Sequence, residues 1–117
     1  MSRKTFIDLL VKNAEKRKEY FANFVEYAEK VKKAVKRLDP DARVIIFGSV
    51  VRGNVRPDSD IDLLIITRIA ENLDERIKLR IKIMEILGEE SPFELHIVSV
   101  KEYENWYRRF MDQFIEL

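Results

Sequence analysis

The residues best suited to chemistry lie close together, between positions 48 and 62. Gly48 and Ser49 are followed by ten residues and then by Asp60-Ile61-Asp62. Side chains alternate along a strand, so Asp60 and Asp62 would share one face about 6.5 to 7 Å apart along the chain. Carboxylates at this spacing can hold one or two divalent cations, which predicts a Mg²⁺ site. Asp and Ser also favour turns because their side chains bond to the nearby backbone, but this does not account for the ten-residue spacing between Gly48-Ser49 and Asp60.

The other half of this segment offers groups that suit phosphate oxygens. Gly48 and Ser49 provide a turn with no side chain at the glycine, backbone N–H groups and one hydroxyl. Arg52 and Arg56 follow, and a planar guanidinium can bind two phosphate oxygens at once. We favour Arg52, because Arg56 precedes Pro57 and is also explained as a solvated loop charge. Together with the carboxylates, these groups predict a site for a metal-bound polyphosphate.

A third carboxylate, Glu94, lies in a later apolar segment. Glu94 and His96 share one face of a strand there, so Glu94 reaches the metal if this strand lies beside Asp62. In phosphoryl and nucleotidyl transfer a carboxylate can take the proton from the attacking hydroxyl, and we assign this role to Glu94. Glu94 is equally consistent with a solvent-facing residue at a strand end. A lone histidine in an apolar strand is more often a hydrogen-bonded core residue than a ligand.

Short apolar runs between turn residues predict three strands, at 42–47, 60–67 and 93–98. One helical turn is predicted at 49–52. A helix that begins at the cap Asn72 and ends at Gly88 joins the second strand to the third, with Ile77, Ile81 and Met84 as its buried face. Strands that alternate with helices predict an α/β or α+β fold.

Helices are also predicted at both ends of the chain. A long helix runs from Ser2 or Thr5 to Leu38, with a break or the start of a projecting arm in the polar stretch 12–19. The closing segment 101–117 is predicted as an amphipathic helix. Aromatic residues recur along it at helical spacing: Tyr103, Trp106, Tyr107, Phe110 and Phe114. Of these, Tyr103, Trp106 and Phe110 are expected in the core.

Composition narrows the class of protein. The chain has 117 residues, of which 46% are hydrophobic and 37% charged, as expected for one folded domain over residues 1–117. The absence of cysteine excludes a disulfide scaffold, a thiolate metal site and a cysteine nucleophile. A net charge of +1 is too small to hold nucleic acid through its phosphates alone. No apolar run approaches the roughly 20 residues of a membrane span, so we expect a cytoplasmic protein with no membrane or direct nucleic-acid partner.

The segment GSVVRGNVRPDSDID resembles the signature of the minimal nucleotidyltransferases (MNT) of the DNA polymerase beta-like superfamily, which is Gly-Ser, ten residues and Asp-x-Asp. The order of the flanking elements is similar to that superfamily's catalytic core over most of the chain. The third acidic position, usually Asp, falls here on Glu94. The resemblance implies a mixed sheet core with flanking helices and Mg²⁺ on Asp60 and Asp62. It also implies that Gly48 and Ser49 hold a nucleoside triphosphate, for which ATP is the expected substrate.

The resemblance also implies a biological setting. Small MNT proteins are commonly encoded beside a helical HEPN protein, which they neutralise as antitoxins, in some pairs by transferring AMP onto a tyrosine. We therefore expect transfer of a nucleoside monophosphate to a hydroxyl of a HEPN-type partner, with the first and last helices as partner surfaces. The alternative is a non-catalytic, antitoxin-like subunit that acts by occluding its partner.

Overall fold

The computed structural model describes residues 3–56 and 58–117. In chain order its elements are α1 (Arg3–Ala22), α2 (Phe24–Leu38), β1 (Arg43–Phe47), α3 (Ser49–Arg52), β2 (Ile61–Ile66), η1 (Arg68–Glu71), α4 (Leu73–Leu87), β3 (Phe93–Val98), α5 (Val100–Asn105), η2 (Tyr107–Phe110) and β4 (Phe114–Glu116). The three predicted strands and the helical turn at 49–52 are confirmed, with strand ends that differ by one residue at most. The alternative helix start at Ser2 and the turn residue Pro57 lie outside the described residues.

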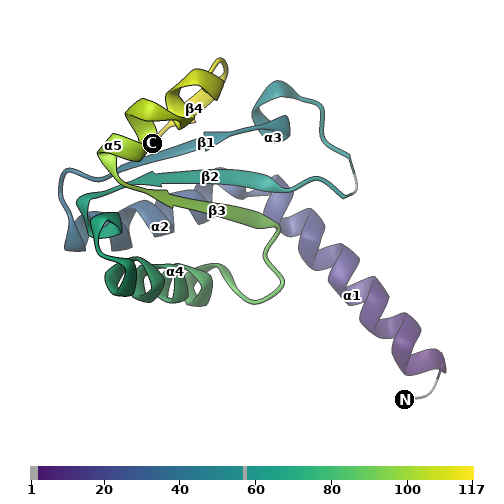
Figure 1. Cartoon of the computed structure of the whole chain (residues 1–117). Coiled ribbons are helices and arrows are strands. Elements are labelled where there is room, and N and C mark those ends of the chain that lie inside the picture. The colour runs from purple at the N-terminus through teal and green to yellow at the C-terminus, as the bar shows by residue number, and fades with distance from the viewer. Residues whose placement is uncertain (1–2, 57) are drawn as a thin grey trace.

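The strands of the described residues form one mixed sheet in the order β3-β2-β1-β4. β1 is antiparallel to both of its neighbours, whereas β2 and β3 are parallel and are joined by a crossover through α4. In Figure 1, α2 and α4 lie on one side of the sheet and α5 on the other. This is the predicted mixed sheet with flanking helices.

Both faces of the sheet are partly covered, and each face has its own apolar cluster. The larger cluster, on one face, joins buried strand residues such as Leu63 and Ile65 to Val35 of α2 and Ile83 of α4. The smaller cluster on the other face consists of Ile45, Leu64, Ile66, Val98 and Tyr103. Because side chains alternate along β2, Asp62 shares the face of Leu64 and Ile66, which the C-terminal segment covers.

The first helix does not break where the polar stretch suggested. α1 is continuous through residues 12–19, and the chain leaves helical geometry at Asn23 (φ −124°, ψ 29°) instead. The side-chain amide of Asn23 donates to the carbonyl of Glu19 at 3.1 Å, which is the kind of local bond that favours Asn at helix ends. Residues 3–16 are exposed and α1 extends away from the sheet (Figure 1), in agreement with a projecting arm.

None of the helices within residues 3–56 and 58–117 combines the length and the apolar character that crossing a membrane requires.

The prediction for the buried face of α4 is wrong. Ile77, Ile81 and Met84 are 48%, 52% and 52% exposed. The face that packs on the sheet consists instead of Leu79, Ile83 and Leu87. The cap prediction holds, since the Asn72 side chain accepts a hydrogen bond from the Glu75 N–H and Gly88 ends the helix. α4 carries apolar residues on two stripes, and helical periodicity alone does not say which stripe meets the sheet.

The predicted C-terminal helix over 101–117 is also wrong. α5 ends at Asn105, the backbone of Trp106 is non-helical (φ −133°, ψ −63°), and the last residues form strand β4 beside β1. The free edge of β1 offers backbone groups that a helix cannot satisfy, and a bidentate ion pair between Arg43 and Glu116 adds to this pairing. Of the three aromatic residues expected in the core, Tyr103 is buried, whereas Trp106 and Phe110 are exposed. Tyr107 is partly buried against the smaller cluster, and Phe114 is exposed.

Candidate active site

The site is built on the corner where β1 turns into α3. Gly48 occupies this corner with a φ of 86° and a ψ of −158°, a combination that is essentially restricted to glycine. A Cβ atom on Gly48 would overlap Oδ2 of Asp62 and lie 3.1 Å from its Cγ. The carboxylate of Asp62 therefore packs directly against the corner, and only a residue without a side chain leaves room for it.

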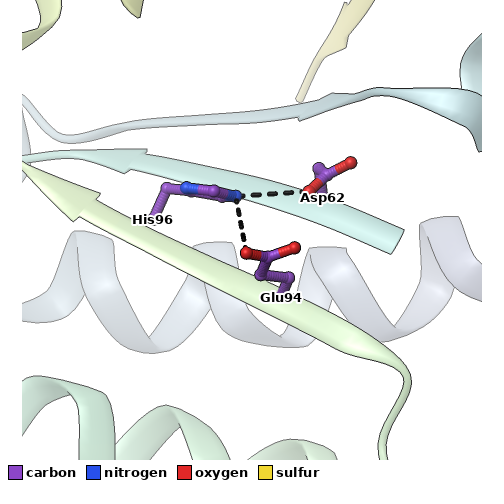
Figure 2. A group of neighbouring side chains, drawn as sticks. All are labelled: Asp62, Glu94 and His96. Atoms are coloured by element: carbon purple, nitrogen blue, oxygen red, sulfur yellow. Dashed lines mark hydrogen bonds and ion pairs between the residues drawn. The ribbon is translucent and has the colours of Figure 1, made fainter. Parts of the chain in front are cut away.

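The strand register places the second carboxylate beside the first. Asp62 on β2 lies opposite Glu94 on the parallel strand β3, and it lies opposite Phe47 on β1. Asp62, Glu94 and His96 each offer one ligand atom, and these three atoms lie within 4.8 Å of one another. Figure 2 shows the imidazole of His96 directed at both carboxylates. The predicted proximity of Glu94 to Asp62 is thus found in the structure.

His96 joins the two carboxylates. Its Nε2 lies 3.2 Å from Oδ1 of Asp62 and 4.0 Å from Oε1 of Glu94. Its Nδ1 lies 3.4 Å from the hydroxyl of Tyr107, and the ring packs between the rings of Phe47 and Tyr107 at centroid distances of 5.3 and 5.7 Å. Burial, followed by the negative charges of Glu102 and Glu94, raises the pKa of Tyr107, so its hydroxyl stays protonated at neutral pH.

The remaining predicted residues lie around this group at different depths. Ser49 is the first residue of α3, next to Gly48, and is half-buried. Arg52 ends α3 with an exposed side chain that pairs with no acidic group among the described residues. Asp60 is exposed, one residue before β2, and does not belong to the group of ligand atoms formed by Asp62, Glu94 and His96.

The loop before β2 is held by α1. The guanidinium of Arg17 donates a hydrogen bond to the carbonyl of Ser59, and Ser59 Oγ accepts one from the Arg56 N–H at 2.7 Å. These bonds fix the backbone next to Asp60. The first helix therefore contributes to the position of the acidic segment.

Two neighbours of the carboxylates were not assigned to the site from the sequence. His96 was interpreted as a core residue, although its position on the same strand face as Glu94 was the signal that could have placed it. Tyr107 had no such signal, because its position depends on the end of α5 and the path of the chain over the sheet. His96 contacts Asp62 through Nε2, and Tyr107 contacts His96 at Nδ1.

Comparison with known proteins identifies the family. The model of the nucleotidyltransferase domain family matches residues 28–115, and the chain belongs to this family. A solved structure named "Crystal structure of putative nucleotidyltransferase" is similar, with a TM-score of 0.65 and 31% identity over 76% of this chain and 95% of that one. A second solved structure, of a protein from Sulfolobus solfataricus with the same description, has a TM-score of 0.57 and 20% identity over 89% of this chain and 85% of that one. A search of curated proteins found no match.

Family membership implies a nucleoside triphosphate and a divalent metal ion, and the donor groups of the structure fit such an ion. Asp62 and Glu94 supply carboxylate oxygens from adjacent strands, and His96 supplies a ring nitrogen. Gly48 leaves the space that the Asp62 carboxylate needs at the corner. The arrangement can thus concentrate negative charge beside a turn whose backbone N–H groups suit phosphate.

Proposed function

We propose that the protein is a Mg²⁺-dependent nucleotidyltransferase that moves AMP from ATP to a hydroxyl on a partner protein, and that it is the antitoxin of a HEPN/MNT pair. The observation that carries the reaction is the packing of Asp62 against Gly48, with Glu94 in register on the adjacent strand. Two carboxylates therefore lie beside a turn that could bind phosphate, where β1 ends and β2 begins.

In this proposal each group has a distinct role. Asp60, Asp62 and Glu94 hold the metal, which when bound neutralises charge on the triphosphate. Asp60 would join the other two carboxylates from its exposed position just before β2. Glu94 accepts the proton of the attacking hydroxyl, which bonds to the α-phosphorus as pyrophosphate leaves.

The triphosphate would lie at the corner before α3. The backbone N–H groups of Gly48 and Ser49 and the Ser49 hydroxyl would donate hydrogen bonds to its oxygens. The exposed guanidinium of Arg52, one turn further along, is free to reach the same phosphates. Exposure of Arg52 fits this role, because a guanidinium already held in an ion pair would bind phosphate less well.

Support for a protein partner comes from exposed apolar side chains. On α1, Phe6, Ile7 and Leu10 are 53%, 48% and 52% exposed. Trp106 and Phe110 are each 58% exposed on the C-terminal segment that covers the face of Asp62. Exposed apolar groups of this size are typical of protein interaction surfaces.

A non-catalytic antitoxin that acts by occlusion is the second candidate. It is favoured by the contact of His96 Nε2 with Asp62 at 3.2 Å, which engages one of the carboxylates that catalysis would need. The two candidates share the fold and the partner, and they differ in whether a nucleotide is transferred.

Incubation with Mg²⁺, α-labelled ATP and the protein encoded next to it separates these candidates. We expect label on a hydroxyl side chain of the neighbouring protein. The double variant Asp60→Asn/Asp62→Asn should reduce labelling on the order of 100-fold or more, because it removes ligands of the metal. Glu85→Gln, which neutralises an exposed carboxylate on α4, is the matched control and should label normally.

Two results together would contradict the transferase reaction. They are absence of label with the wild-type protein, and neutralisation of the partner by the double variant as effectively as by the wild type. Circular dichroism and thermal unfolding of the double variant check that it is folded.

A further inference from the structure

We propose that His96 is itself a metal ligand, and that Asp62, Glu94 and His96 form a site that prefers a first-row transition-metal ion such as Mn²⁺ over Mg²⁺. The inference rests on the metal site of the proposed function, but not on the transfer of a nucleotide. The alternative from the sequence analysis, in which His96 is a hydrogen-bonded core residue and not a ligand, is tested by the same experiment.

The spacing of the three ligand atoms fits one ion. With bonds of about 2.1 Å, two ligand atoms of one ion lie about 3.0 Å apart at a right angle and about 4.2 Å apart in trans positions. His96 Nε2 lies 3.2 Å from Asp62 Oδ1 and 4.0 Å from Glu94 Oε1. Both distances fall inside this interval, and all three ligand atoms, the oxygens of Asp62 and Glu94 included, lie within 4.8 Å of one another. A single ion can therefore contact the nitrogen and both oxygens after a small movement of the carboxylates toward each other.

The surroundings of the ring direct Nε2 toward the carboxylates. Phe47 and Tyr107 pack against the imidazole, and its Nδ1 lies 3.4 Å from the Tyr107 hydroxyl. This hydroxyl can donate to Nδ1 or accept a hydrogen bond from it. When Nδ1 carries the proton and donates to Tyr107, the lone pair of Nε2 points to the space between Asp62 and Glu94. A metal-bound histidine is commonly held in this way by a partner on its second nitrogen.

The mixed donor set determines the metal preference. Mg²⁺ prefers oxygen ligands and gives up its water molecules reluctantly, so a ring nitrogen is a poor ligand for it. Imidazole suits the transition-metal ions, whose affinity for a given site rises from Mn²⁺ toward Cu²⁺. Asp62 and Glu94 alone would accept either kind of ion, and His96 shifts the preference toward the transition metals.

The full-length protein, freed of metal with a chelator, tests this proposal with Mn²⁺ and Mg²⁺ as probes. Binding of Mn²⁺ is measured by electron paramagnetic resonance, and binding of Mg²⁺ by its competition with Mn²⁺. We expect pulsed measurements on the Mn²⁺ complex to show a ¹⁴N coupling from a directly bound imidazole. This coupling can come only from His96, because the chain contains one histidine.

Variants separate coordination from a structural role. His96→Gln should weaken Mn²⁺ binding by about 10-fold to 100-fold and remove the ¹⁴N coupling, while the affinity for Mg²⁺ changes by less than about threefold. Tyr107→Phe should weaken Mn²⁺ binding by about 10-fold, since it removes the hydroxyl that orients the ring. Glu85→Gln, on the opposite face of the sheet, should change neither affinity.

The outcomes distinguish this inference from the function on which it rests. Wild-type protein that binds Mn²⁺ without a ¹⁴N coupling, or an unchanged ratio of Mn²⁺ to Mg²⁺ affinity in His96→Gln, would overturn the role of His96 and leave the carboxylate site intact. Wild-type protein that binds neither ion better than Asp62→Asn would overturn the metal site as a whole.

Discussion

Replacement of Gly48 by alanine should push the Asp62 carboxylate away from the corner at Gly48. The backbone of Gly48 is in a region essentially confined to glycine, so an alanine there costs about 1 to 3 kcal/mol of stability. Its Cβ would also overlap Oδ2 of Asp62 and lie 3.1 Å from Cγ. The Asp62 carboxylate must then rotate away and lose its 3.2 Å contact with His96 Nε2.

Gly53→Ala is the matched control for this substitution. Gly53 also has a positive φ, of 77°, but nothing lies within 4 Å of a Cβ added to it. Alanine there costs about 1 to 2 kcal/mol through backbone strain alone. In urea unfolding Gly48→Ala should therefore lose at least as much stability as Gly53→Ala, and only Gly48→Ala should lose Mn²⁺ affinity, by about 10-fold or more.

A double-mutant cycle with Asp62→Ala isolates the crowding at the corner. If the added Cβ acts through the Asp62 carboxylate, Gly48→Ala should cost less stability in the Asp62→Ala background than in the wild type. Equal Mn²⁺ affinities for the Gly48→Ala and Gly53→Ala variants would refute the reasoning, because the carboxylate would then not need the space at residue 48.

Two further predictions concern the scaffold. Ile83→Ala should lower the free energy of unfolding by about 2 to 5 kcal/mol, because Ile83 is buried. Ile81→Ala, at an exposed position of the same helix, should lower it by less than about 1 kcal/mol. Similar losses for the two variants in urea unfolding would contradict the assigned buried face of α4. The pKa of the Asp39 carboxyl lies below its usual range. Burial by itself would raise this pKa, but hydrogen bonds from the Thr67 hydroxyl and from the backbone N–H groups of Asp41 and Arg68 outweigh the effect of burial. The stability from the Asp39 carboxylate is therefore present above about pH 4 and is lost as the pH falls through the lowered pKa. Asp39→Asn should lose less free energy of unfolding than the wild type between about pH 6 and about pH 3, and equal losses would count against this coupling.

The sequence by itself determined the local features of the fold and the central part of the site. Each strand could be recognised from its own apolar run, because β-branched residues and flanking turn residues act over a few positions. The Gly48 turn and the acidic start of β2 could be paired from their spacing, and the structure places Asp62 against Gly48. The proximity of Glu94 to Asp62 was predicted on the assumption that their two strands are neighbours. The structure shows that β2 and β3 pair, with Asp62 opposite Glu94.

Only the tertiary structure decided which surfaces meet. α4 has two apolar stripes, and contact with the sheet selects the one that contains Ile83. The C-terminal residues could have continued a helix, but the open edge of β1 pairs with them as β4. His96 and Tyr107 meet beside Asp62 because the C-terminal segment turns back over the sheet. These contacts join residues far apart in the chain, so they depend on the free energy of the whole packed molecule and leave no periodic pattern in the sequence.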